Sequence, residues 1–182
     1  NAGNAEAVES KLKEMGADYI VLESDISNED AVKEIYSTVL EKYGQVDVLF
    51  NNAATDDETG CDTIETITPK VIDDTFAVNV RGSILMTREF IKHRSDYGRI
   101  INISSISQFE AASGRCHYCA SKGAIGMLTK GMALELAEKN ISNALNNCCS
   151  VTAPLLRRKK PTLPGTITFI SAKTEHLYTC YL

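Results

Sequence analysis

The 182-residue sequence lacks three features that mark common classes of protein. It has no excess of positive charge, because 24 Asp and Glu outnumber 19 Lys and Arg, so nucleic acid is not an expected partner. No run reaches the roughly 18 apolar residues of a membrane span, so no membrane association is expected. The first residues also lack the basic and then apolar pattern of a secretion signal. We therefore expect a soluble globular domain in the cytoplasm.

The six cysteines do not form a pattern typical of disulfide or metal sites. Disulfide frameworks belong to small secreted chains, so reduced thiols are expected here. Cys116 and Cys119 form a C-x-x-C pair, which is typical of redox or metal sites. No second pair is spaced to complete the four ligands that zinc usually takes. The interpretation we favour is two small structural side chains and no metal.

Charge and composition change near Asn140. Residues 140–182 contain five Lys and Arg and one Glu, a charge of +4, which leaves −9 on residues 1–139. Three of the four prolines also lie there, and no helical or strand period runs through most of the segment. We therefore predict a domain over residues 1–141 and an atypical basic tail over residues 142–182. The basic run at 157–160 has no interleaved aromatic residues, so a solvated loop is favoured over a nucleic-acid site.

Helix and strand patterns alternate along the predicted domain. Short apolar runs predict strands over 18–23, 46–50 and 99–104. Amphipathic spacing predicts helices over 4–15, 28–44, 69–94 and 113–138. Ser27 or Asn28 is expected to cap the second helix and Gly44 to end it, and Thr68 with Pro69 to begin the third. This order predicts an α/β fold with a doubly wound parallel sheet, a Rossmann-like arrangement of three layers (α/β/α). In such sheets the functional site forms at the carboxyl ends of the strands.

The predicted strands end in polar or small residues. Asp25 follows the first strand, the run Asn51-Asn52-Ala53-Ala54 the second, and Ser104-Ser105 the third. Each of these residues has a simpler explanation, since Asp and Ser cap helices and Asn forms turns.

Tyr118 and Lys122 lie four residues apart in the last predicted helix, which puts both side chains on one helix face. A phenol has an ordinary pKa near 10, too high for efficient proton transfer at neutral pH, but a nearby ammonium favours the phenolate. A serine hydroxyl at the same place could polarise a substrate carbonyl.

These residues resemble the classical short-chain dehydrogenase/reductase family from the start of the chain to about residue 141. The likeness rests on four segments in the right order: N-N-A-A at 51–54, F-A-V-N-V at 76–80, I-N-I-S-S at 101–105, and the Y-x-x-x-K motif at 118–122. A single Y-x-x-x-K motif is weak evidence, whereas four ordered elements are hard to obtain by chance.

The resemblance implies a catalytic role for four residues. Tyr118 would be the acid/base, and Ser105 would orient and polarise the substrate. Lys122 would lower the pKa of Tyr118 and hydrogen-bond the nicotinamide ribose of the cofactor. Asn79 would support a proton-relay water behind the lysine.

The resemblance also implies a dinucleotide cofactor, NAD or NADP, that exchanges a hydride with the substrate. Asp25 would accept from the adenine amino group, with Ile26 against the ring. Asn51 and Ala53 would lie along the adenosine ribose.

The family pattern begins before this sequence does. It would start with a strand, a glycine-rich turn and a helix that binds the pyrophosphate, so a first βαβ unit of about 35 residues is expected to be missing. After residue 141 the family's next strand motif is replaced by other residues. We therefore hypothesise a truncated chain whose tail arises from a reading-frame shift or an erroneous gene model.

Three functions are compatible with these observations. The first is an NAD(P)-dependent oxidoreductase that interconverts a small alcohol and a ketone or aldehyde, and forms a homo-oligomer, a dimer or tetramer, through the two long helices. The second is an inactive remnant that acts at most as an interaction module. The third, a flavodoxin-like binding module, fits the strand order but gives no joint use to Ser105, Tyr118 and Lys122.

Overall fold

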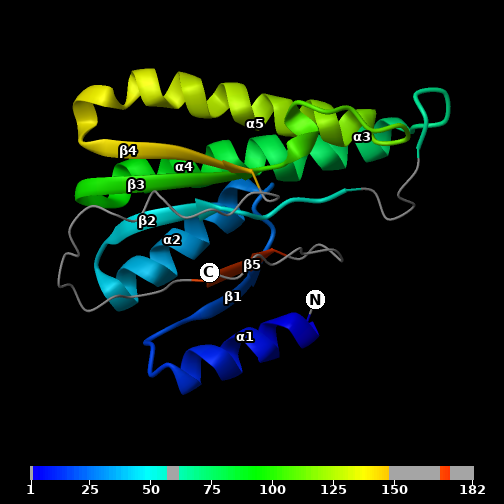
Figure 1. Cartoon of the computed structure of the whole chain (residues 1–182). Coiled ribbons are helices and arrows are strands. Elements are labelled where there is room, and N and C mark those ends of the chain that lie inside the picture. The colour runs from blue at the N-terminus through cyan, green and yellow to red at the C-terminus, as the bar shows by residue number, and fades with distance from the viewer. Residues whose placement is uncertain (1, 57–61, 148–168, 173–182) are drawn as a thin grey trace.

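The chain is described here by a computed structural model, which covers residues 2–56, 62–147 and 169–172 (Figure 1). Helices and strands alternate as the sequence predicts. The helices are α1 (Ala2–Glu14), α2 (Glu29–Tyr43), α3 (Pro69–Phe76), α4 (Ser83–His93) and α5 (Cys116–Glu135). The strands are β1 (Val21–Ser24), β2 (Val46–Asn51), β3 (Arg94–Ser104), β4 (Ile141–Asn147) and β5 (Phe169–Ala172). Within these ranges no helix is both long and apolar enough to cross a membrane.

Local interactions set the helix ends. The Asn28 side chain accepts hydrogen bonds from the backbone of Asp30 and Ala31 at the start of α2, and Gly44 ends that helix with φ 79°. Thr68 caps α3 by accepting from Val71, with Pro69 in the first turn. The caps predicted from the sequence are confirmed.

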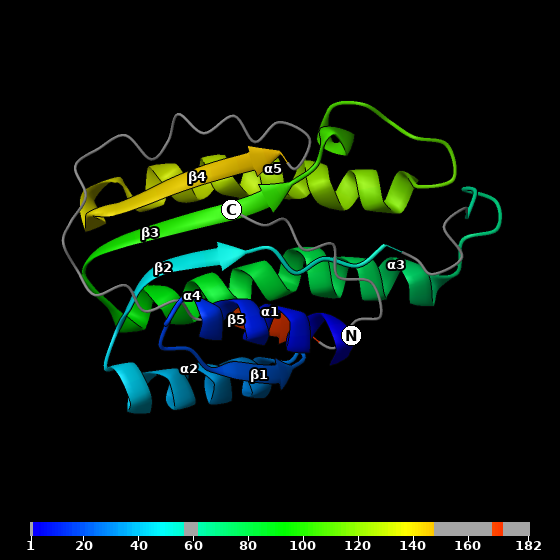
Figure 2. The same cartoon turned by 60° about the horizontal axis from the view of Figure 1, so that its bottom comes forward.

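All strand pairs in the described residues are parallel. β3 lies between β2 and β4, and β1 pairs with β5 in a separate two-stranded sheet. Figures 1 and 2 show α2, α4 and α5 on one face of the strands and α1 on the opposite face, so the three-layer α/β fold is confirmed. The arrows of β1 to β4 point the same way, which brings their carboxyl ends to one edge (Figure 2).

The strand β4 crosses the predicted domain boundary, and β5 lies beyond it. β4 begins at Ile141 and pairs with β3 along its whole length, from Gly98 opposite Ile141 to Ser104 opposite Asn147. The sheet therefore continues across the predicted boundary at residues 141/142. Most of the predicted tail, including its basic run at 157–160, lies outside the described residues.

The core fills the space between the sheet and the helices α2 and α4. Phe90 of α4, Val32 of α2 and Ile100 of β3 are fully buried. Tyr36 of α2 is also buried, and its hydroxyl donates to the Met86 carbonyl of α4 over 2.9 Å. Burying each large apolar side chain contributes about 1.5–3 kcal/mol, so this seam fixes the helices on the sheet.

The helix predicted over residues 69–94 is present from 69 to 93, but it is not a regular α-helix throughout. A π-helical turn, Ala77–Gly82, separates α3 from α4, and it contains the buried Asn79. Two contacts favour the turn: the Ser83 hydroxyl donates to the Asn79 carbonyl over 3.0 Å, and Gly82 packs directly on Ile26. The wider turn is a tertiary effect, which helical spacing alone does not reveal. Such turns are frequent at functional sites.

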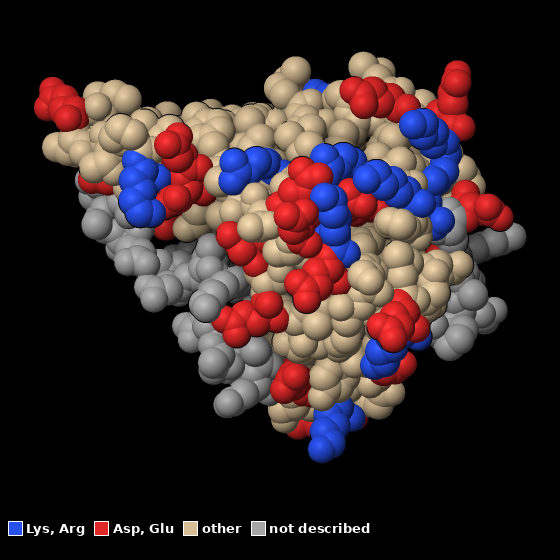
Figure 3. Space-filling model, turned by 180° about the vertical axis from the view of Figure 1, so that it is seen from behind, with Lys and Arg blue, Asp and Glu red and all other residues tan. Residues whose placement is uncertain are grey.

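Figure 3 views the molecule from behind and shows Lys and Arg mixed with Asp and Glu on this face. Ion pairs between exposed side chains include Arg88 with Glu29 at 2.9 Å and Lys33 with Glu29 at 3.2 Å. Exposed pairs of this kind contribute little to stability, typically under about 1 kcal/mol each. The mixed charges are typical of a solvated face.

Candidate active site

The first turns of α5 are fixed to the carboxyl end of β3. Lys122 is 4% exposed, and its ammonium donates to the Ile103 carbonyl over 3.1 Å. The Ser104 hydroxyl donates to the Lys122 carbonyl over 3.1 Å. Two hydrogen bonds between strand and helix therefore hold the lysine head group in one position.

Tyr118 lies one helical turn before this lysine. The Lys122 nitrogen is 5.6 Å from the centre of the Tyr118 ring, so the two side chains share a helix face as their spacing predicts. A second cation lies closer, because the guanidinium carbon of Arg115 is 4.6 Å from the same centre. Sequence reasoning missed Arg115, although its position three residues before Tyr118 places it on the same face.

Asn79 joins the loop after β2 to α5. Its side-chain amide donates to the Thr55 carbonyl and to the Ser121 hydroxyl, each over 2.9 Å, and its oxygen accepts from the Thr55 backbone over 2.7 Å. The Ser121 hydroxyl in turn donates to the Tyr118 carbonyl over 2.7 Å. Asn79 thus contacts the residue that directly precedes Lys122.

Ser105 directly follows β3 and caps a short 3₁₀ turn, Ile106–Gln108, that packs against α5. Its hydroxyl accepts from the Ser107 backbone over 3.2 Å and donates to the Ser107 hydroxyl over 3.2 Å. Ser105 therefore caps this turn, which is the simpler explanation of a serine at a strand end. Capping is compatible with a catalytic role, because the 3.2 Å hydrogen bond from the Ser105 hydroxyl to the Ser107 hydroxyl is long for its type.

Asp25 and Ile26 directly follow β1. The Asp25 side chain is exposed, and one of its oxygens accepts from the Ser27 backbone over 2.8 Å. Ile26 is only 5% exposed, and a Cβ added to Gly82 would lie 2.7 Å from its Cδ1 atom. Ile26 therefore packs under the π-helical turn and offers little surface to a ligand.

The Asn51 side chain points into a buried amide network. Its nitrogen donates to Thr87 of α4 over 3.0 Å and to Asn102 of β3 over 2.8 Å. Asn102 then donates to Thr129 of α5 over 2.9 Å and to Asn143 of β4 over 3.2 Å. The sequence gives one signal for this network, a polar residue between Ile101 and Ile103.

Ala53 lies after the carboxyl end of β2 and is half-buried against the core. Its small side chain leaves room for a ligand near the backbone of this loop. Together, the carboxyl ends of β2 and β3 carry Ala53, Ser105 and the start of α5, whereas Asp25 lies at the end of β1.

A charged cluster lies beside Tyr118. Asp56, in the loop after β2, forms an ion pair with Arg115 at the start of α5. Burial alone would lower the pKa of Arg115. The hydrogen bond and charge of Asp56, together with the charges of Tyr118 and Cys119, outweigh burial and raise this pKa above its ordinary value. The buried His117 has its Nε2 atom 3.8 Å from Asp56 Oδ1.

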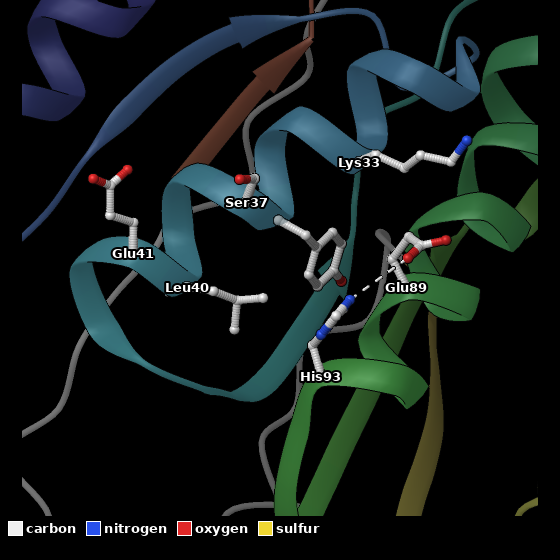
Figure 4. A pocket seen from close by; sticks show the side chains of 7 residues that line it. Lys33, Ser37, Leu40, Glu41, Glu89 and His93 are labelled. Carbon is white, nitrogen blue, oxygen red and sulfur yellow. Dashed lines mark ion pairs between the residues drawn. The ribbon is translucent and has the colours of Figure 1, made fainter.

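A cavity of about 640 Å³ lies elsewhere, between α2 and α4 (Figure 4). It is lined by Lys33, Tyr36, Ser37, Leu40, Glu41, Glu89 and His93. Glu89 is buried, and the Lys92 hydrogen bond lowers its pKa despite burial, which opposes the shift. Burial raises the pKa of Tyr36, with a smaller contribution from Glu89. Since the predicted site residues do not line this cavity, we assign it no role in the reaction.

No group of three His, Cys, Asp or Glu residues that could hold a metal ion occurs among the residues that the structure describes. Cys116 is exposed and Cys119 is partly exposed, and both are free thiols. The C-x-x-C pair is therefore not a disulfide in this structure.

Comparison with known proteins agrees with the fold and the motifs. A model of the short chain dehydrogenase family matches residues 1–163, which extends past the boundary predicted at 141. An NADPH-dependent aldehyde reductase of Arabidopsis thaliana, named as chloroplastic, is 34% identical over 122 residues, which are 67% of this chain and 42% of the relative. The chain spans about half the length of the curated relatives it matches.

Solved structures give the same result. A 3-ketoacyl-(acyl-carrier-protein) reductase from Brucella melitensis, in complex with NADH, matches with a TM-score of 0.64 and 33% identity, over 68% of this chain and 53% of that one. A double mutant of a short-chain dehydrogenase/reductase from Serratia marcescens matches with a TM-score of 0.75 and 30% identity, over 81% and 59%. The chain therefore belongs to the short-chain dehydrogenase/reductase family, whose members are oxidoreductases that use NAD or NADP.

Proposed function

We propose that the protein with this sequence is an oxidoreductase that interconverts an alcohol and a ketone or aldehyde, with Tyr118 as the acid/base. The observation that carries the proposal is the position of Lys122. Its ammonium is buried, is held by the Ile103 carbonyl at 3.1 Å, and lies 5.6 Å from the Tyr118 ring. A fixed cation in a site with little water has a stronger effect on a neighbouring phenol than an exposed one.

Tyr118 moves the proton in this proposal. In the reductive direction its hydroxyl donates to the carbonyl oxygen of the substrate, and the resulting phenolate is stabilised by Lys122. In the oxidative direction the phenolate takes the alcohol proton. Proton transfer from a group positioned in this way contributes typically about 10²–10⁴-fold to the rate.

Ser105 polarises the substrate oxygen. Its hydroxyl proton goes to Ser107 in the structure, over 3.2 Å, and would turn to the substrate oxygen when substrate binds. The Ser107 backbone continues to donate to the same hydroxyl oxygen, which keeps the side chain in place. A donor aimed at an oxygen that gains negative charge stabilises the transition state.

The Asn79 side chain holds two parts of the site together. All of its side-chain hydrogen bonds given above go to Thr55 and Ser121, so the amide holds the loop and α5 together. The relay water would therefore use the Asn79 main-chain carbonyl, which accepts from Ser83 in the structure. This role remains a prediction from the family resemblance.

The residues at the strand ends fit parts of NAD or NADP. Bound cofactor supplies or accepts the hydride at its nicotinamide ring. Lys122 would donate to the nicotinamide ribose, since an ammonium is a donor of three protons. Asp25 would accept from the adenine amino group through its exposed carboxylate. Ala53 would leave room for the adenosine ribose, and the Asn51 backbone would also lie along that ribose. The structure favours neither NAD nor NADP.

A second candidate is an interaction module without catalysis, or an interface within a homo-oligomer. It is favoured by the exposed apolar side chains on α3, α4 and α5: Ile72, Ile84, Met127 and Leu134, which are 38%, 43%, 65% and 83% exposed. A contiguous apolar patch of this kind marks an interaction surface, so this candidate requires the four side chains to lie together. A dimer or tetramer with small-molecule substrates is compatible with both candidates.

The first test is binding. The purified chain is titrated with NADH and NADPH while nicotinamide fluorescence and far-ultraviolet circular dichroism are followed. Saturable binding by a folded chain supports the oxidoreductase, and a folded chain without binding favours the interaction module.

The second test is turnover by the protein that carries this sequence, assayed with a panel of aldehydes and ketones. Tyr118→Phe should abolish turnover and leave cofactor binding nearly intact, because Lys122 still reaches the ribose, whereas Lys122→Ala should weaken both. The matched control is Tyr97→Phe, which removes a hydroxyl from an exposed tyrosine away from the site. Full activity in Tyr118→Phe would contradict the proposal.

A further inference from the structure

The feature with no role in the proposed reaction is the charged cluster beside Tyr118. Asp56 comes from the loop after β2, while Arg115 and His117 come from the start of α5. The Arg115 Nη2 atom contacts Asp56 Oδ2, and the guanidinium carbon lies 4.6 Å from the centre of the Tyr118 ring. One arginine therefore contacts both the loop and the tyrosine.

Asp56 and His117 are largely removed from water, whereas Arg115 is partly exposed. The side chains of Asp56, Arg115 and His117 are 16%, 36% and 3% exposed. Within the described part of the chain, Asp56 Oδ1, Arg115 Nε and both ring nitrogens of His117 have no hydrogen-bond partner. Charges that are partly buried and incompletely paired cost stability, so stability alone does not explain this arrangement.

The position of Tyr118 suggests an explanation. Arg115 lies three residues before it and Lys122 four residues after it, so the ring has a cation on the preceding turn and another on the following turn. A cation near an aromatic ring is attracted to the ring face, and it favours a phenolate over a phenol. Both effects act on the group that the proposed reaction requires.

We propose that Arg115, held by Asp56, is a positioning residue that orients the Tyr118 ring and stabilises its anionic form together with Lys122. This inference rests on the proposed function, in which Tyr118 exchanges a proton with the substrate. Arg115 itself does not exchange a proton, because a guanidinium stays charged at any working pH.

The charges around the ring set the direction of the effect. Arg115 and Lys122 favour the phenolate, Asp56 offsets part of the Arg115 charge, and His117 faces Asp56 rather than adding a second ion pair to the ring. An opposite charge close to a phenol favours the phenolate, and Asp56 offsets part of the Arg115 charge. We expect Arg115 to lower the pKa of Tyr118.

The reciprocal effect is present on the arginine. The charge of Tyr118 is one of the causes that raise the pKa of Arg115, after the larger effects of burial, which lowers it, and of Asp56, which raises it. Coupling between two groups acts equally on both. This coupling agrees with the position of the guanidinium beside the ring.

The experiment is a spectroscopic titration of tyrosinate absorbance in the intact 182-residue chain. The difference between the wild type and Tyr118→Phe isolates the titration of Tyr118. Arg115→Gln should move this titration to higher pH, and Arg115→Lys should retain most of the wild-type position because it keeps the charge. Circular dichroism verifies that each variant is folded.

Arg99→Gln is the matched control. Arg99 also lies over a tyrosine ring, that of the exposed Tyr97, at 5.8 Å. The control removes an arginine from a tyrosine without changing the surroundings of Tyr118. Its Tyr118 titration should coincide with that of the wild type.

An unchanged Tyr118 titration in folded Arg115→Gln overturns the inference. If that variant does not fold, Arg115→Met decides by the same criterion, because it is neutral and retains the aliphatic stem. The readout does not depend on turnover, so failure of the proposed function, seen as full activity in Tyr118→Phe, is distinguished from failure of this inference. In the active protein, the basic limb of the kcat/KM profile should shift with the titration.

Discussion

The buried amide of Asn102 should be a main stabilising element of the sheet. Its side chain is completely buried and makes three hydrogen bonds, with Asn51, Thr129 and Asn143, at 2.8, 2.9 and 3.2 Å. These bonds connect β3 to both neighbouring strands and to α5. Asn102→Ala removes all three at once.

The cost can be worked out from the bonds lost. Each of the three hydrogen bonds contributes about 1 kcal/mol net, and leaving a buried partner unsatisfied adds about 1–3 kcal/mol, so Asn102→Ala should lower the free energy of unfolding by about 4–6 kcal/mol. A domain of this size has about 5–15 kcal/mol in total, so the loss should be easy to see. The measurement is urea unfolding followed by circular dichroism, with the midpoint and slope compared.

Two further variants sharpen the test. Gln45→Ala is the control, because Gln45 is an exposed amide with a hydrogen bond to Asp47 at 3.1 Å, and its loss should cost less than about 0.5 kcal/mol. The double variant Asn51→Ala, Asn102→Ala should cost about 1–2 kcal/mol less than the sum of the single ones, because the two residues share a bond. A loss below about 1 kcal/mol in Asn102→Ala would refute the reasoning, since water would then replace the network without cost.

Two other predictions concern the helices. Gly82→Ala would place a Cβ 2.7 Å from Ile26 Cδ1, so it should destabilise the chain by about 1–3 kcal/mol in thermal unfolding. The control Gly123→Ala has open space around the new Cβ and should be neutral or stabilising. Equal effects of the two substitutions would contradict the close packing at Gly82. The hydrogen bond from Lys92 lowers the pKa of Glu89. The contribution of the Glu89 carboxylate to the free energy of unfolding is therefore complete above the ordinary glutamate pKa of 4.5, and it is lost as the pH falls below that value. The stability difference between wild type and Glu89→Gln should therefore shrink on acidification in urea midpoints, and a constant difference down to the lowest pH would contradict this.

The sequence predicted those parts of the fold that depend on local interactions. The caps at Asn28 and Thr68 were predicted because a side chain that accepts from the next turn acts within a few residues. The alternation of strands and helices followed from apolar spacing. The π-helical turn at Ala77–Gly82 was missed because its causes lie elsewhere in the chain, in the contacts of Asn79 with Thr55 and of Gly82 with Ile26.

The strand β4 shows a different limit. Its residues after Ile141 are mostly polar, so no apolar alternation indicates a strand. It forms because backbone hydrogen bonds to β3 do not depend on side-chain polarity, and because Asn143 finds partners in Asn102 and Thr129. The pairing of β1 with β5 could not be foreseen either, since it joins segments at opposite ends of the chain.

The candidate site also contains features that the sequence predicts and features that it does not. The one-turn relation of Tyr118 and Lys122 follows from helix geometry and was therefore predictable. The contact of Arg115 with Asp56 was not, because it joins residues 59 apart in sequence. Fold information was needed to find that Asp56 holds the second cation at the tyrosine.

Asn79 shows why loss of activity alone cannot assign its role. Its side chain holds Thr55 and Ser121, so Asn79→Ala would displace the loop and the turn that carries Tyr118, whatever happens to a relay water. A relay through the main-chain carbonyl is affected differently, because the Ser83 hydroxyl donates to that oxygen over 3.0 Å. Ser83→Ala removes this donor and leaves the Asn79 side chain in place. Comparing the two variants therefore separates a structural asparagine from one whose carbonyl holds water.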